Sequence, residues 1–193
     1  MIVENLDQAG PEELKAAVFN YLAFSTADFR TYERLKDRRV IPVLIEILDA
    51  GGAPPFASGD LPPERVELVM TGAAHLLGDV ATAEDKDAVR SLLGALDHEN
   101  DRVKIAAAKA LGQMRAAEAA GKVAALTRRM LEQGELGGIS KLVPVLGQIG
   151  GEEARSLLES FVEGNQDSQD KHVQYVVGIA NEALAAIRAR QAG

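Results

Sequence analysis

The sequence predicts an all-α fold in which helical hairpins repeat along the chain. Leu-Gly pairs recur at intervals of about 35 residues, which indicates an internal repeat. Aromatic residues make up only 4% of the chain and tryptophan is absent, whereas alanine is abundant, a composition that favours closely packed helices. Apolar residues also follow positions i, i+3, i+4 and i+7, as in a helix with one buried face.

The repeat consists of two alternating kinds of segment. The Leu-Gly pairs and their terminal variant are Leu77-Gly78, Leu111-Gly112, Leu146-Gly147 and Leu184-Ala185. Successive pairs are 34, 35 and 38 residues apart. Segments with a paired aliphatic step lie between them, at 40–49, 88–97, 153–162 and, in a looser form, 121–131. Each unit is therefore expected to contain two antiparallel helices.

Residues 103–114 resemble the first helix of a HEAT-like repeat, of the subtype shared with phycobilisome lyases. The matching residues are Val103, Lys104, Ala107, Ala108, Ala110, Leu111 and Gly112. The resemblance covers roughly residues 11–190. It implies a single domain, 1–193, that forms a right-handed α-solenoid of about five HEAT-like hairpins with an atypical N-terminal cap.

This architecture explains why residues 101–114 contain four alanines and a glycine but few bulky side chains. A first helix lies between its neighbours in a stack, and small residues let the backbones approach closely. The larger apolar side chains come from the second helices. Since one hairpin cannot bury its apolar face alone, the stack as a whole forms the core.

The N-terminal cap repeat is expected at about 11–50 and begins with Pro11, a favourable first residue of a helix. It holds five of the eight aromatic residues: Phe19, Tyr21, Phe24, Phe29 and Tyr32. We interpret them as filling for a terminal repeat that lacks one neighbour, and the alternative is a binding site.

Residues 50–63 form a Pro- and Gly-rich insertion that is too long for a usual helix connection. Phe56 is its one large aromatic side chain. One interpretation is that Phe56 folds back onto the helices, and the other is that it anchors a partner protein.

The remaining repeats are expected at about 64–98, 99–133 and 134–164, followed by a C-terminal capping helix at 170–190. Pro144 falls inside the first helix of the third of these repeats, where it should kink the helix near Ser140.

The sequence contains no constellation from which a catalytic residue, a metal ligand or a cofactor site is predicted. Cysteine is absent, which excludes disulfides and thiolate sites. The pair His98-Glu99 is similar to the metal-binding pairs of deoxyhypusine hydroxylase, another HEAT-like family, but that family uses several such pairs and this chain has one. We therefore expect a turn there, with Asn100 or Asp101 as a helix cap.

The formal net charge is −8 and the isoelectric point is about 5.0, so nucleic acid is not an expected partner. The acidic N-terminus shows no signal peptide, and no apolar run is long enough to span a bilayer. These observations predict a cytoplasmic protein without membrane contact.

In HEAT-like repeats the second helices line a concave face. Aligning the hairpins places the following residues near one stripe: Glu46, Arg90, Arg128, Arg129, Arg155 and Glu159. A column of Arg and Glu suits an acidic or amphipathic peptide or helix of another protein. The leading hypothesis is thus a non-enzymatic adaptor that binds a protein partner.

A second hypothesis comes from the phycobilisome-lyase resemblance. Bilin lyases of HEAT-like build act as paired subunits, so the chain would be a lyase or an accessory subunit that requires a companion chain.

Overall fold

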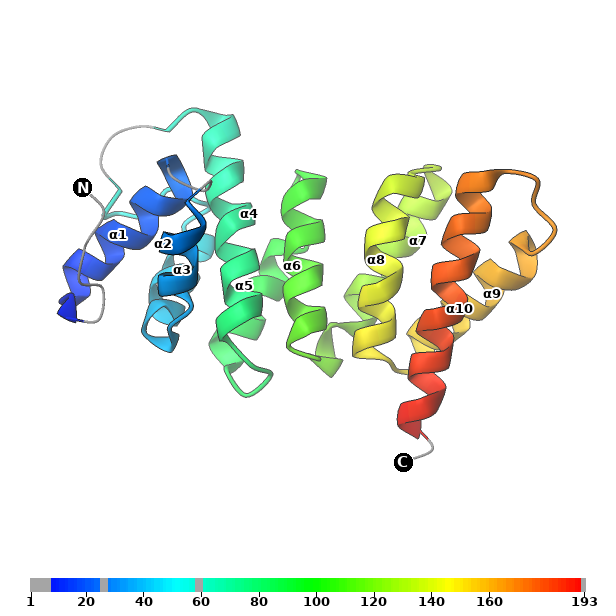
Figure 1. Ribbon diagram of the computed structural model, residues 1–193. Coiled ribbons are helices and arrows are strands. Elements are labelled where there is room, and N and C mark those ends of the chain that lie inside the picture. The colour runs from blue at the N-terminus through cyan, green and yellow to red at the C-terminus, as the bar shows by residue number, and fades with distance from the viewer. Residues whose placement is uncertain (1–7, 25–27, 58–60, 192–193) are drawn as a thin grey trace. The chain divides into compact units, whose positions relative to one another are not determined.

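The structure, a computed structural model, describes residues 8–24, 28–57 and 61–191 (Figure 1). Within these ranges the chain is all-α, with ten α-helices and no strand, which confirms the all-α part of the predicted fold class. The helices are α1 (Pro11–Phe24), α2 (Phe29–Leu35), α3 (Ile41–Asp49), α4 (Pro63–Val80), α5 (Lys86–Ala95), α6 (Asp101–Gln113), α7 (Ala120–Glu132), α8 (Leu136–Ile149), α9 (Glu152–Asn165) and α10 (Lys171–Gln191). The expectation about a signal peptide concerns the N-terminal segment, of which the first seven residues lie outside the described part.

The helices fall where the two alternating segments predict them. The Leu-Gly segments lie in α4, α6 and α8, and the Leu-Ala variant lies in α10. The paired-aliphatic segments form α3, α5, α7 and α9. The right-handed stacking and the number of five hairpins remain predictions from the sequence.

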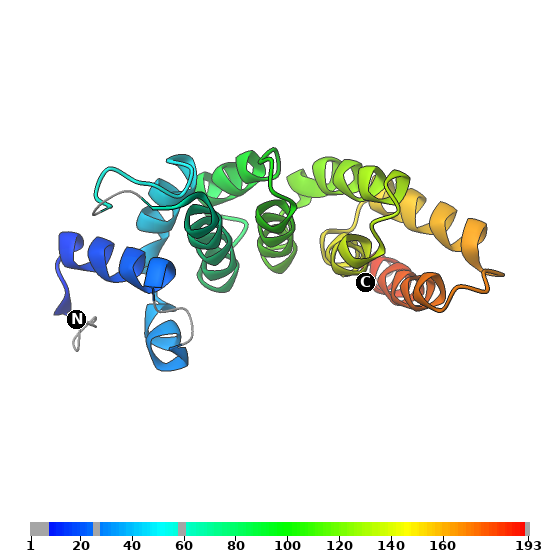
Figure 2. The ribbon, with the colours of Figure 1, turned by 90° about the horizontal axis from the view of Figure 1, so that it is seen from above.

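Contacts within the chain divide it into two compact units, unit 1 (Met1–Ala110) and unit 2 (Leu111–Gly193). In unit 1, α3 and α5 form one layer, and α1 and α4 form the other (Figure 2). Leucine and isoleucine side chains from both layers meet between them and are fully buried, among them Leu22, Leu44, Ile47, Leu76, Leu77 and Leu92. An apolar core of this kind stabilises the unit by removing these side chains from water.

The aromatic residues of the N-terminal cap are only partly used as filling. Phe19 and Tyr21 are buried, but Phe24 and Phe29 are 62% and 71% exposed. The difference follows from position, because Phe24 ends α1 and Phe29 begins α2. Asp28 caps α2 by accepting hydrogen bonds from the backbone N–H groups of Arg30 and Thr31.

The insertion after α3 begins with a tight turn at Gly51 and Gly52, whose φ angles are +62° and +83°. A side chain at Gly52 would also collide with the carbonyl oxygen of Val66, 2.8 Å from the Cβ position. Glycine is therefore required there by both conformation and space. Residues 58–60 of the insertion lie outside the described part of the chain.

In unit 2, α7 and α9 form one layer, and α8 and α10 form the other (Figure 2). Glycine permits the close packing that the sequence predicts: a Cβ atom at Gly147 of α8 would lie 2.8 Å from the Cβ of Ala183 in α10. Helix α8 runs as one element through Pro144. The hydroxyl of Ser140, one turn earlier, donates to the carbonyl oxygen of Gly137 at 3.0 Å.

Candidate functional site

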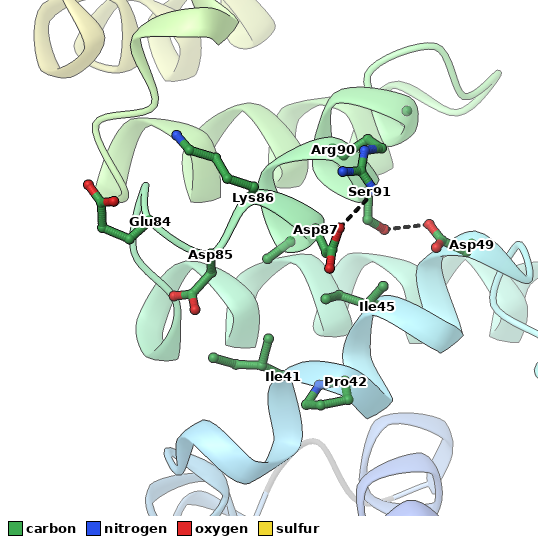
Figure 3. Close-up of a pocket in the computed structure, with 12 residues that line it drawn as sticks. Ile41, Pro42, Ile45, Asp49, Glu84, Asp85, Lys86, Asp87, Arg90 and Ser91 are labelled. Carbon is green, nitrogen blue, oxygen red and sulfur yellow. Dashed lines mark hydrogen bonds and ion pairs between the residues drawn. The ribbon is translucent and has the colours of Figure 1, made fainter.

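An open groove of about 700 Å³ lies between α3 and α5 in unit 1 (Figure 3). Both are second helices in the predicted repeat. The groove is lined by Ile41, Pro42, Ile45 and Asp49 from α3, by Glu84 and Asp85 before α5, and by Lys86, Asp87, Ala88, Arg90, Ser91 and Gly94 from α5. We refer to these twelve residues as the α3–α5 groove.

The floor of the α3–α5 groove is apolar, and it is open at the end where Gly94 lies. Ile41 and Ala88 are buried, Ile45 is half-buried, and Pro42 is exposed in the first turn of α3. Proline is tolerated at this helix position because the first N–H groups have no partner within the helix. Gly94 has no atom within 4 Å of its Cβ position, so the floor stays open at that end.

The polar rim of the groove is held in place by contacts between elements. The hydroxyl of Ser91 donates to Oδ1 of Asp49 at 2.7 Å and thus joins α5 to α3. The Arg38 guanidinium donates to Oδ1 of Asp85 at 2.6 Å. The backbone N–H of Thr82 is the largest cause of a lowered pKa at Asp85, and Arg38 contributes to it.

Arg90, which the sequence analysis places on a binding stripe, does lie on the rim of the groove. Its guanidinium is already engaged, since it donates to Oδ1 of Asp87 at 2.7 Å within the same helix. Both side chains are about three-quarters exposed, so this pair is weak, and the contact of Arg90 with an acidic or amphipathic partner stays a prediction.

Glu46 and Phe56 both contact Lys15 and lie outside the α3–α5 groove. The Lys15 ammonium of α1 is 3.1 Å from Oε2 of Glu46 and 5.2 Å from the centre of the Phe56 ring. The hydrogen bond that the Lys15 ammonium donates to Glu46 raises the pKa of Lys15. Phe56 in turn packs edge-on against Phe19, with ring centres 6.1 Å apart. This geometry corresponds to the interpretation in which Phe56 folds back onto the helices.

The other predicted stripe residues lie in unit 2. Arg155 and Glu159 are one turn apart on α9. Arg155 pairs with Glu152 of the same helix at 2.6 Å, and Glu159 pairs with Arg188 of α10 at 3.3 Å. The hydrogen bonds that Arg155 donates to Glu152, together with the charges of Glu152 and Glu159, raise the pKa of Arg155. On α7, Arg128 is exposed and Arg129 is half-buried. A stripe that continues from unit 1 to unit 2 remains a prediction.

A second hollow, of about 490 Å³, lies on the α1, α2 and α4 side of unit 1. Its lining is mainly aromatic and aliphatic: Tyr21, Leu22, Phe29, Tyr32, Leu68, Thr71, Gly72 and His75. The Tyr32 hydroxyl donates to Oδ2 of Asp79 at 2.6 Å, and burial together with this bond raises the pKa of Tyr32. Desolvation by neighbouring groups lowers the pKa of His75, and the charge of Lys109 lowers it further.

The segment His98-Glu99 is a turn. The backbone N–H of Asn100 donates to Nδ1 of His98 at 3.0 Å, and the Asn100 side chain accepts from the backbone N–H of Arg102 at 2.8 Å. Asn100 therefore caps α6, as one of the two sequence interpretations has it. In the part of the chain that the structure describes, no group of three or more His, Cys, Asp or Glu residues is arranged to hold a metal ion. No described helix has the length and apolar character needed to cross a membrane.

The sequence analysis missed the α3 side of the groove. Pro42, Ile45 and Asp49 are spaced i, i+3 and i+7, so helical periodicity alone places them on one face. The signal was overlooked because Ile45 also fits the buried pattern of the helix. Ser91 gave no such signal, because its role depends on a bond to a residue 42 positions away.

The chain matches no protein-family model. None of the curated proteins matches it either. The HEAT-like interpretation accordingly depends on the repeat residues themselves.

Proposed function

We propose that this protein is a non-enzymatic interaction scaffold built of HEAT-like hairpins, and that it binds a peptide or helix of another protein in the α3–α5 groove. The observation that carries the proposal is an open groove of about 700 Å³ whose floor is apolar and whose rim is polar and fixed between two helices. Apolar grooves between helices are a common site for peptide segments, because apolar anchors insert while the rim selects the register.

The groove has the features that make peptide docking favourable. Its rim is ordered before binding, since Ser91 holds Asp49 and Arg38 holds Asp85. Pre-ordered contacts lower the entropy that association costs. The floor offers Ile45 and Pro42, which are partly exposed and are available to a partner's apolar side chain. Removal of such apolar surface from water contributes about 25 cal/mol per Å², which offsets part of the entropy that association costs.

Gly94 provides a direct test. A tryptophan there would extend over the groove without meeting another atom near its Cβ, so Gly94→Trp should block the groove while leaving the fold intact. Gly178→Trp is the matched control, because Gly178 lies within α10, also has nothing within 4 Å of its Cβ position, and is remote in sequence from the groove.

The experiment pans a phage-displayed library of random peptides, long enough for about five helical turns, on wild-type protein and on both variants. Peptides that enrich on the wild type and on Gly178→Trp, but not on Gly94→Trp, are the expected result. Circular dichroism verifies that both variants keep the wild-type helicity. If no peptide distinguishes Gly94→Trp from Gly178→Trp, the α3–α5 groove is not a docking site.

A further inference from the structure

The charges along the α3–α5 groove are not balanced. Four carboxylates line it, from Asp49, Glu84, Asp85 and Asp87, against the cations of Lys86 and Arg90. The chain as a whole carries a net charge of −8. Both the local and the overall field therefore attract cationic segments and repel anionic ones.

Two of these carboxylates are already matched by a cation of the protein. Asp87 accepts from Arg90 at 2.7 Å, and Asp85 accepts from Arg38 at 2.6 Å. Asp85 also accepts from the backbone N–H and the hydroxyl of Thr82, so both of its oxygens are engaged. These pairs shape the rim but offer a partner little uncompensated charge.

Asp49 is different, because a neutral group orients it. Its Oδ1 accepts from the hydroxyl of Ser91 at 2.7 Å, and Ser91 is only 7% exposed. The buried hydroxyl holds the carboxylate without neutralising it. Within the described residues no cation pairs with Asp49, so its charge is directed at the groove and is available to a partner.

Glu84 is the second such charge, and it stands at the other end of the groove. Figure 3 shows Glu84 and Asp49 on opposite sides, with Ile41, Pro42 and Ile45 between them. The carboxylate of Glu84 has no hydrogen-bonding or ionic partner among the residues that the structure describes, and its side chain is exposed. In the same view the side chains of Glu84 and Lys86 both extend away from Ile41 and Pro42, so Glu84 would meet a partner beyond the end of the apolar floor and not over it.

The geometry points to a partner segment in which apolar side chains are flanked on both sides by Lys or Arg. The apolar side chains would contact Pro42 and Ile45, and the two basic groups would pair with Asp49 and Glu84. This inference rests on the proposed function, because it names the partner of the same groove. It specifies a basic amphipathic segment, where the sequence analysis leaves an acidic or an amphipathic peptide or helix open.

The test uses the enriched peptides from the panning experiment. Their composition should shift to apolar residues with flanking Lys or Arg, relative to the unselected library. A fluorescein-labelled copy of the most enriched peptide, and a copy in which Glu replaces each Lys and Arg, are then titrated into the protein and followed by fluorescence anisotropy. The charge-reversed copy should bind at least about tenfold more weakly.

Conservative variants locate the charges. Asp49→Asn keeps an oxygen that accepts from Ser91, and Glu84→Gln keeps the shape of an exposed side chain. Each should weaken binding about twofold to fivefold, as is typical of exposed ion pairs, and the two together about tenfold. Glu99→Gln is the control, since Glu99 is an exposed carboxylate of unit 1 that does not line the groove; it should leave the affinity unchanged.

The outcomes separate this inference from the proposed function. Groove-dependent peptides that are acidic, or basic ones that bind the Asp49→Asn/Glu84→Gln variant as tightly as the wild type, would overturn the inference and leave the docking groove in place. A library without any peptide sensitive to Gly94→Trp would overturn both. Basic, apolar peptides weakened by the two neutral variants, but not by Glu99→Gln, would support both.

Discussion

Gly147 in unit 2 and Gly94 in unit 1 both lie inside helices, yet their surroundings are opposite. A Cβ atom at Gly147 would lie 2.8 Å from the Cβ of Ala183, whereas one at Gly94 would have nothing within 4 Å. The first glycine lets α8 and α10 approach closely, and the second leaves a groove open between α3 and α5. Glycine thus has two distinct surroundings in this chain, close helix packing at Gly147 and an open groove at Gly94.

The two units also differ in how aromatic side chains are used. In unit 1 the Phe56 ring joins the insertion after α3 to Phe19 of α1 and lies beneath the Lys15 ammonium. Unit 2 has only Phe161 and Tyr175, of which Tyr175 is 65% exposed. Close backbone packing thus plays the part in unit 2 that aromatic filling plays in unit 1.

The largest effect is expected from breaking the close approach in unit 2. Gly147→Leu forces a side chain into the backbone of α10, because the Cα of Ala183 is 3.0 Å from the Cβ position. Overpacking of this kind should lower the free energy of unfolding by about 3 kcal/mol. Urea denaturation followed by circular dichroism measures the change. Gly178→Leu is the control and should not destabilise the protein, and equal losses in the two variants would contradict the close approach.

A smaller effect is expected from breaking the aromatic contact in unit 1. Phe56→Ala removes a half-buried ring and its edge-on contact with Phe19, and should cost about 2 kcal/mol of unfolding free energy. Phe29→Ala, which removes a ring that is 71% exposed, should change it by less than about 0.5 kcal/mol. The same urea denaturation compares the two, and the expectation fails if Phe29→Ala is the more damaging variant.

The next effect in size is a difference between the two units in their loss of stability at low pH. In unit 1 the pKa of Asp28 is lowered by the Thr31 hydroxyl, that of Asp37 by the Arg39 side chain, and that of Asp85 by the backbone N–H of Thr82. A carboxyl group with a lowered pKa in the folded state stabilises the fold above the unfolded pKa of about 3.9 and loses this contribution as the pH falls through the folded pKa. The stability of unit 1 should therefore decrease as the pH falls from about 5 to about 2.

Hydrogen exchange followed by mass spectrometry, corrected for the intrinsic rate at each pH, measures this loss separately in each unit. Peptides of unit 1 should lose protection at a higher pH than peptides of unit 2. Asp85→Asn should make unit 1 less sensitive to acid, since it removes one titrating group. Earlier loss of protection in unit 2 would contradict the assignment.

The smallest effect is expected from alanine substitutions at the two glycines. Gly94→Ala should stabilise the protein by about 0.5–1 kcal/mol, because alanine has the higher helix propensity and the site is open. Gly147→Ala should lack this gain because of the contact with Ala183. Thermal unfolding of the two variants provides the measurement, and a gain at Gly147 equal to that at Gly94 would show that α8 and α10 separate easily.

Much of the secondary structure was predictable, and the reason is local. The Leu-Gly and paired-aliphatic segments predicted eight of the helices. Helical periodicity shows in the spacing of apolar residues over one or two turns, so it can be recognised from a short stretch of sequence. The short helix α2 was missed, since its seven residues contain too few apolar positions to show a period. The one local sequence feature at its start is Asp28, a residue type that favours the N-cap position and that caps α2 in the structure.

The candidate site was predictable only in part. Arg90 was identified as a residue of an exposed face and does border the groove, and its pairing with Asp87 follows from the i, i+3 spacing in one helix. Glu46 was assigned to the same face, but it pairs with Lys15 of α1. One helical position, about 100° of rotation, separates Ile45 in the groove from Glu46 outside it, and the repeat pattern does not define the rotation of a helix that finely.

The sequence by itself determined the helical class of this protein, the sites of most helices and the small residues along their packing faces. These properties depend on neighbours within one or two turns, which the order of residues specifies directly. Only the tertiary structure decided that Asp49 meets Ser91, that Arg38 meets Asp85 and that Lys15 meets Glu46. The partners in these pairs are separated by 42, 47 and 31 positions in the chain. Such pairs depend on how the helices cross and in which register they pack, and side-chain shape across the whole core decides both.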